Sequence, residues 1–188
     1  VPGLRVGITT KSPAIMRDID LLRRIAASGE LVVNISLTSL DAALLRRIEP
    51  RAPRPDLRLA AMAELTAAGV PARLFAMPVL PFLTDRETGL RALFTAARAA
   101  GAREAIWNVL FLRGETHGFF LDFIAREFPR LLPRYRALYA GGATAEASYR
   151  ERVERLAARV ALEAGFPGRS RADRIAAERP ARPRQLLL

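Results

Sequence analysis

The residues best suited to bind a ligand lie at the end of the first predicted strand. The segment GITTKSP, residues 7–13, closes that strand and contains Lys11, the only lysine among 30 basic residues. A lysine ammonium is a compact point charge that suits a carboxylate or a phosphate, and Thr10 and Ser12 place hydroxyl groups on either side of it. We therefore interpret Lys11 as a ligand contact.

A second set of polar side chains lies within the next predicted strand, LVVNISLT, residues 31–38. Side chains alternate between the two faces of a strand, so Asn34, Ser36 and Thr38 share one face and apolar residues occupy the other. Buried polar groups without partners cost about 1–3 kcal/mol each. A polar ligand is favoured as their partner, because α/β folds bind ligands at the carboxyl ends of strands. Hydrogen bonding between neighbouring strands is the structural alternative.

The composition narrows the chemistry that the chain performs by itself. It has 188 residues, about the length of one domain, and 51% of them are apolar, which is enough to form a core. The absence of cysteine excludes disulfides, a thiolate nucleophile and cysteine ligands to a cluster. One histidine without cysteine does not predict a zinc site. We assign no catalytic residue and no metal ligand to the chain.

The net charge of +11 favours a polyanionic partner such as nucleic acid. Solvated helix faces rich in arginine would give the same charge. No apolar run reaches the ~20 residues of a membrane-spanning helix, and no leader segment opens the sequence. We expect a cytoplasmic protein that has no membrane partner.

The spacing of apolar residues predicts an α/β fold. Strands are expected to begin near residues 5, 31, 72 and 105, each followed by a helix. This alternation of strands and helices predicts four β-α units over residues 1–112, in a parallel sheet with right-handed crossovers. The helix after the second strand is expected to stop at EPRAPRP, residues 49–55, because a residue before proline is held extended. Thr84 and Glu87 predict a capping box for the helix that precedes Gly101.

The remainder of the chain follows a different pattern. Residues 113–165 are expected to form a C-terminal helical extension, with helices over 117–128, 129–140 and about 144–164. Phe119 and the phenylalanines that follow it in the first of these helices are expected to pack on the sheet. Residues 166–188 are rich in arginine and proline with little apolar periodicity, so they are expected to form a basic disordered tail.

Several segments, taken together in this order, resemble a known family. ITTKS, ISLTSLD and EPRAPRPDLRLAAMAELTAAGVPARLFAMPVLPFLTD are similar to the middle and later part of radical S-adenosylmethionine (SAM) proteins of the spore photoproduct lyase-related group. The resemblance extends to about Gly165. It implies a partial (β/α) barrel of six units, of which this chain supplies four. It also implies a [4Fe–4S] cluster on three cysteines of a C-x-x-x-C-x-x-C motif, which splits SAM reductively to a 5′-deoxyadenosyl radical.

The resemblance also assigns residues to the cofactor. Lys11 and Ser12 at one strand end, with Ser36 in the next strand, are implied to contact the carboxylate, amine or ribose of SAM. Glu49 and Arg51 fall near the mouth of the barrel without a chemical role. The full set of expected SAM-binding residues is Lys11, Ser12, Ser36, Thr10, Thr38 and Asn34.

The lack of cysteine places the cluster outside this chain. We expect the chain to be a fragment, the C-terminal part of a radical SAM iron–sulfur enzyme of the lyase or oxidoreductase type, and to be inactive alone. Its partner would be a missing N-terminal region, or a separate polypeptide, that carries the cysteine motif. The alternative is a non-catalytic basic α/β module that binds nucleic acid or another polyanion.

The fragment hypothesis has a structural consequence. If two units are missing, the segment LRVGIT, residues 4–9, becomes an exposed apolar edge strand. Such an edge invites pairing with another chain, so the chain is expected to dimerise or aggregate through it.

Overall fold

The strands expected from the sequence form one parallel sheet. The structure is a computed structural model and describes residues 5–167. Within this range the order of strands across the sheet is their order along the chain, and each neighbouring pair is parallel. The strands are β1 (Arg5–Thr10), β2 (Glu30–Ser36), β3 (Ala72–Val79) and β4 (Glu104–Val109).

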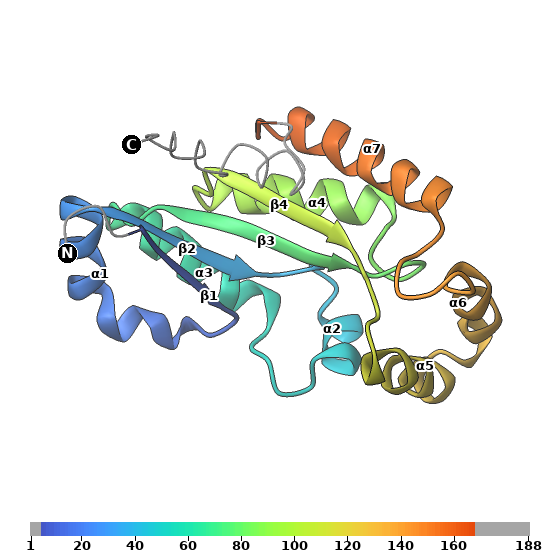
Figure 1. Cartoon of the computed structure of the whole chain (residues 1–188). Helices are drawn as coiled ribbons and strands as arrows, with labels where there is room; N and C mark the ends of the chain where they lie inside the picture. The colour runs from blue at the N-terminus through green and yellow to red at the C-terminus, as the bar shows by residue number, and fades with distance from the viewer. Residues whose placement is uncertain (1–4, 168–188) are drawn as a thin grey trace, which may run out of the picture.

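Helices connect the strands on one face of the sheet. Right-handed crossovers that always step in the same direction place their helices on the same side. Figure 1 shows α3 and α4 lying along the strands, and α1 beside the end where β2 begins. The shorter α2 lies beyond the strand ends, before the chain returns through α3. The predicted α/β class, with four parallel strands alternating with helices as in a partial (β/α) barrel, is confirmed. The elements are η1 (Pro13–Asp18), α1 (Ile19–Ser28), α2 (Ala42–Ile48), α3 (Pro55–Ala67) and α4 (Glu87–Ala99).

The two faces of β2 differ as the alternation predicts. Val33 and Ile35 are fully buried against the helices. Asn34, between them, points to the other face and is half-buried. The strand register aligns a row of polar side chains on that second face, and they are exposed or half-buried, so this face of the sheet is open. The row consists of Thr9, Asn34, Arg73 and Glu104.

A helical segment follows β4, as expected. It begins at Gly114, whose φ of 53° is a conformation that favours glycine. The last helix packs on α4, where Glu87 accepts hydrogen bonds from Arg159 at 2.7 Å and Arg91 at 2.9 Å. These bonds lower the pKa of Glu87 to about 2. The elements are α5 (Glu115–Glu127), η2 (Pro129–Leu131), α6 (Leu132–Leu138) and α7 (Ala147–Glu163).

This helical segment fixes the loop that follows β3. The Tyr135 hydroxyl donates to the carbonyl of Pro81, and the Tyr149 hydroxyl donates to Asp85. Phe82, with a φ of 64°, lies between these two tyrosines at ring distances of 5.5 and 5.7 Å. A non-glycine residue at positive φ needs support from its surroundings, and the two tyrosines supply it. The helical segment therefore holds the loop at the end of β3 in place.

Two local expectations are wrong. Phe119 is 70% exposed, because α5 turns Phe120 and Phe123 inward instead. Thr84 does not cap α4, since its hydroxyl accepts a hydrogen bond from the Leu80 amide at 2.8 Å and so stabilises the loop.

The described residues include the first part of the expected basic tail. Phe166, the first residue of that tail, is buried and meets Phe94 edge-on. Residues 168–188 of the expected tail lie outside the described residues. Among residues 5–167, none of the helices combines the length and apolar character required to span a bilayer.

Self-association through the β1 edge is testable with one added charge. Within residues 5–167, β1 pairs only with β2. A Cβ atom at Gly7 would meet no atom within 4 Å, so the backbone has room for Gly7→Lys, which adds a charge to the edge strand. We expect sedimentation velocity to show that the unmodified chain associates as its concentration rises and that Gly7→Lys stays monomeric.

The control is Gly89→Lys, which adds the same charge at an exposed and equally open position of α4. It should associate like the unmodified chain. If the unmodified chain is monomeric at every concentration, the prediction that it self-associates through β1 is wrong.

Candidate functional site

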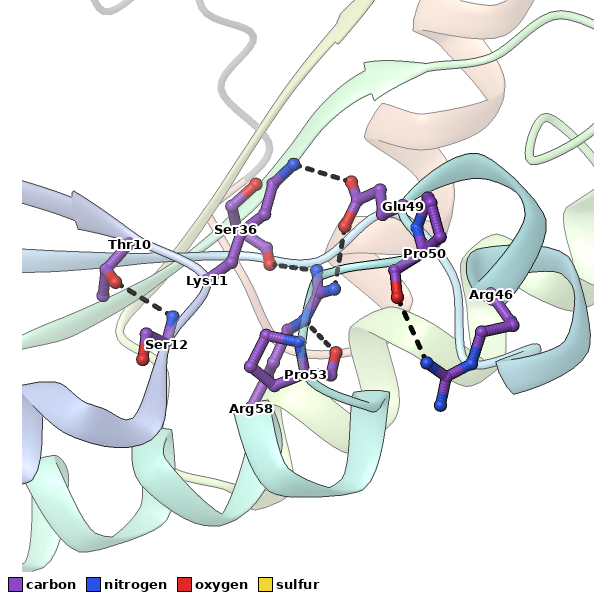
Figure 2. A network of polar contacts seen from close by, with 9 residues as sticks. All are labelled: Thr10, Lys11, Ser12, Ser36, Arg46, Glu49, Pro50, Pro53 and Arg58. Atoms are coloured by element: carbon purple, nitrogen blue, oxygen red, sulfur yellow. Dashed lines mark hydrogen bonds and ion pairs between the residues drawn. The ribbon is translucent and has the colours of Figure 1, made fainter.

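The predicted site residues of β1 and β2 lie at the same edge of the sheet. Thr10 and Ile35 are partners in the strand register, so Lys11 and Ser36, the next residues, are neighbours where the two strands end. Figure 2 shows both side chains at this edge, beside the turn that follows α2. The two strand ends thus converge as the sequence predicts.

The Lys11 ammonium is held by a carboxylate. Its Nζ lies 2.8 Å from Glu49 Oε1, and Arg58 Nη2 lies 2.8 Å from Glu49 Oε2. Glu49 therefore bridges two cations, Lys11 just after β1 and Arg58 on α3, as Figure 2 shows. Glu49 is placed here because α2 ends at Ile48 and the following prolines prevent the helix from continuing.

Arg58 is buried, and all of its nitrogens have acceptors. Its side chain is 1% exposed. Nη1 donates to the carbonyl of Ser36 at 3.0 Å, and Nε donates to the carbonyl of Pro53 at 2.8 Å. A buried charge is tolerated only when it is paired and hydrogen-bonded. Arg58 meets this condition by joining the end of β2, the proline-rich turn and α3.

The charges around Glu49 keep it ionised. Burial by itself would raise the pKa of Glu49, but the hydrogen bonds from Lys11 and Arg58 outweigh burial and hold that pKa below its ordinary value. Glu49 is thus a carboxylate at neutral pH. The three charged groups together carry a single net positive charge.

Two of the predicted hydroxyl groups serve the backbone. Thr10 Oγ1 accepts a hydrogen bond from the Ser12 amide at 2.9 Å. Ser12 caps η1, and its Oγ accepts from the Ala14 amide at 3.1 Å. Both groups fix the turn that presents Lys11. Each hydroxyl keeps its own proton for a further hydrogen bond.

The polar groups at the end of β2 have unused hydrogen-bonding capacity. The strand was expected to run to residue 38 but ends at Ser36, so Thr38 lies just beyond it. Ser36 and Thr38 are 7% and 6% exposed, and neither hydroxyl bonds to another group in residues 5–167. Asn34 Nδ2 donates to Thr9 Oγ1 at 3.2 Å, whereas Asn34 Oδ1 is buried without a partner in the described chain. The structural alternative of mutual hydrogen bonding therefore accounts for only one of these groups. The others are available to a ligand or to water.

The edge of the sheet at which the strands end, called the mouth below, is apolar at β3 and β4. A cavity of about 190 Å³ lies at the ends of β3 and β4, lined mainly by apolar side chains and by Asn108. The mouth thus offers a cation and hydroxyl groups at β1 and β2, and an apolar cavity at β3 and β4. This combination suits an amphipathic ligand with an anionic end and a flat end. The cavity is lined by Phe75, Met77, Pro78, Asn108, Leu110 and Phe111.

Comparison with known proteins gives one family match for this part of the chain. Residues 1–93 match the family model of the radical SAM superfamily. The match covers β1, β2 and β3, and with them every residue of the Lys11–Glu49–Arg58 network. The four strands and their helices are consistent with part of a radical SAM barrel.

Relatives extend the similarity beyond the radical SAM match. An uncharacterized protein of Mycobacterium tuberculosis (strain H37Rv) is 38% identical over 160 residues, which are 85% of this chain and 47% of that protein. An uncharacterized protein of Methanocaldococcus jannaschii is 29% identical over 82 residues, 44% of this chain and 30% of that protein. The chain therefore spans about half the length of the mycobacterial relative.

The radical SAM match implies two cofactors, and the chain fits only one of them. Full-length members use SAM and a [4Fe–4S] cluster. The free hydroxyl groups, the unpartnered Asn34 Oδ1 and the exposed Lys11 fit the polar parts of SAM. The chain contains no cysteine, and residues 5–167 hold no group of three His, Asp or Glu side chains that could bind a metal. It therefore does not fit the cluster.

The sequence placed Glu49 near the mouth but assigned it no chemical role, and it did not identify Arg58 as part of the site. A signal for Arg58 was present, because it precedes Ala61, Met62 and Leu65 on the buried stripe of α3. A charged residue on the apolar stripe of a helix needs a buried partner. The only acidic candidate in the preceding turn, EPRAPRP, is Glu49.

Arg58 should be important for stability. We expect Arg58→Met to lower the free energy of unfolding by about 3 kcal/mol, because it leaves two carbonyls and one carboxylate oxygen without their donor. Urea denaturation measures this loss. Arg54→Met is the control, since Arg54 lies at the same end of α3 but forms an exposed pair with Asp56, worth at most about 1 kcal/mol. Equal stabilities of the two variants would show that the buried guanidinium is not needed.

Proposed function

We propose that this chain is the later part of the barrel of a radical SAM iron–sulfur enzyme of the spore photoproduct lyase-related group, and that it holds SAM at the ends of β1 and β2. The observation that carries the proposal is that Lys11 is fixed beside hydroxyl groups that lack partners in the described chain. The resemblance of the EPRAP turn and of the loop after β3 supports the finer family assignment.

Each part of SAM has a counterpart at the mouth. Lys11 has protons beyond the one it donates to Glu49, and these suit the SAM carboxylate. Ser36, Thr38 and Asn34 suit the ribose hydroxyls, because a hydroxyl both donates and accepts and an amide oxygen accepts. The apolar cavity at β3 and β4 suits the flat purine. Ser12 and Thr10 orient Lys11 through the turn that they cap.

The chain's part in the reaction is to bind and orient SAM. SAM bound to a reduced cluster supplies a 5′-deoxyadenosyl radical. The cysteines for that cluster would come from a missing N-terminal region or from a separate polypeptide. The greater length of the mycobacterial relative supports this division. We propose that the chain alone is inactive and that the complete enzyme is of the lyase or oxidoreductase type.

A second role, binding of nucleic acid without catalysis, is favoured by arginines at the rim of the mouth. Arg134 stacks on Phe82 at 3.9 Å, and Arg113 stacks on Phe111 at 5.5 Å. Neither guanidinium has a carboxylate partner in residues 5–167. This second role would be supported if the chain binds oligonucleotides with an affinity that falls steeply as salt rises and does not bind SAM.

The single lysine allows a direct test of SAM binding. Growth with [13Cε]lysine gives the chain one labelled side chain, Lys11. We expect S-adenosylhomocysteine, which retains the carboxylate of SAM, to shift this NMR signal. Lys11→Met should weaken binding of the same ligand, measured by calorimetry, on the order of tenfold or more, because a charge-assisted hydrogen bond is lost.

The control ligand is 5′-methylthioadenosine, which lacks the carboxylate. Its affinity should be unaffected by Lys11→Met. If S-adenosylhomocysteine leaves the Lys11 signal unmoved, or binds equally well to Lys11→Met, the proposed role of Lys11 is wrong.

A further inference from the structure

We infer that Glu49 shifts the selectivity of the Lys11 subsite toward a singly charged anion, such as a carboxylate, and away from a doubly charged one, such as sulfate. The inference rests on the proposed binding of an anion at Lys11 and adds the residue that determines which anion is accepted. Glu49 acts through Lys11, so it is a positioning residue.

The exposure of the two side chains defines the direction of approach. The Lys11 side chain is 45% exposed, whereas that of Glu49 is 14% exposed. An ammonium has three hydrogen-bond donors, and Glu49 takes one of them. An anion can therefore bind Lys11 from the solvent side while Glu49 stays behind the ammonium.

Glu49 is held in this position from the other side. Its second carboxylate oxygen lies 2.8 Å from Arg58, whose side chain is 1% exposed. Arg58 is itself fixed by the carbonyls of Ser36 and Pro53. Because Arg58 is buried and each of its nitrogens already donates to the protein, it offers nothing to a ligand directly. The ligand meets Lys11 with the Glu49 charge close behind it.

The charge of Glu49 then acts differently on the two kinds of anion. Lys11 and Arg58 are cations and Glu49 is an anion, so the network has one net positive charge. The Glu49 carboxylate repels each negative charge of a ligand bound at Lys11. This repulsion opposes a doubly charged anion about twice as strongly as a singly charged one, so Glu49 shifts the preference of the subsite toward the carboxylate. Glu49 is ionised at neutral pH, since its pKa is lowered.

The measurement compares two anions at the labelled Lys11 of the full chain. Sodium sulfate and sodium acetate are titrated at matched ionic strength, and the [13Cε]Lys11 signal reports the affinity of each. We expect Glu49→Gln to raise the affinity for sulfate relative to acetate on the order of tenfold. A loss of Lys11 positioning would weaken the binding of both anions and would not raise the affinity for sulfate relative to acetate, so a raised ratio reports the charge of Glu49.

Two further variants complete the design. Glu151→Gln makes the same chemical change on α7, where Glu151 is exposed and paired with Arg155, and it should leave the ratio unchanged. Glu49→Asp keeps the charge but withdraws it by one methylene, so it should shift the ratio in the same direction by a smaller factor. It provides the test if Glu49→Gln does not fold.

The outcomes separate this inference from the proposed function. An unchanged sulfate-to-acetate ratio in the Glu49 variants, in a chain whose Lys11 signal still responds to S-adenosylhomocysteine, overturns only the selectivity by Glu49. If no anion and no S-adenosylhomocysteine moves the Lys11 signal, both the selectivity and the proposed role of Lys11 are wrong.

Discussion

The mouth of this sheet depends on one buried guanidinium. Arg58 lies among the apolar residues of α3, where an unpaired charge would be costly. The fold meets that cost by bringing three acceptors to it from β2, the proline-rich turn and the end of α2. Because Arg58 needs a carboxylate partner, Glu49 is held where it also contacts Lys11. The position of the exposed cation that ends β1 thus follows from how a buried cation is compensated.

The two halves of the chain support the mouth in different ways. On the side of β1 and β2, charges and hydrogen bonds fix the turn that contains Glu49. On the side of β3, Tyr135 and Tyr149 hold the loop through Pro81 and Asp85. Arg47 of α2 also stacks on Phe128 and bonds to Glu127, which ties α5 to the first half. The helical segment therefore stabilises the loops around the mouth as well as covering β4.

The sequence predicted those features that depend on local periodicity. The four β-α units and the polar face of β2 follow from apolar spacing, and Lys11 was expected at the mouth because it ends a strand. The partner of Lys11 was not predicted, since Glu49 lies 38 residues away and its position depends on the path of a turn. Nor does the sequence distinguish a hydroxyl that caps a turn, as Ser12 does, from one that is free for a ligand. Phe119 was misplaced because only the packed structure fixes which side of α5 faces η2 and α6.

Glu49 and Arg58 must act as one unit if the buried guanidinium positions the mouth. A double-mutant cycle with Glu49→Gln and Arg58→Met, read as the free energy of unfolding in urea, measures their interaction directly. A buried, hydrogen-bonded ion pair predicts that the two losses are far from additive, with an interaction energy of about 2 kcal/mol. Losses that add to within about 0.5 kcal/mol would mean that the two residues are independent, and that Arg58 does not hold Glu49 beside Lys11.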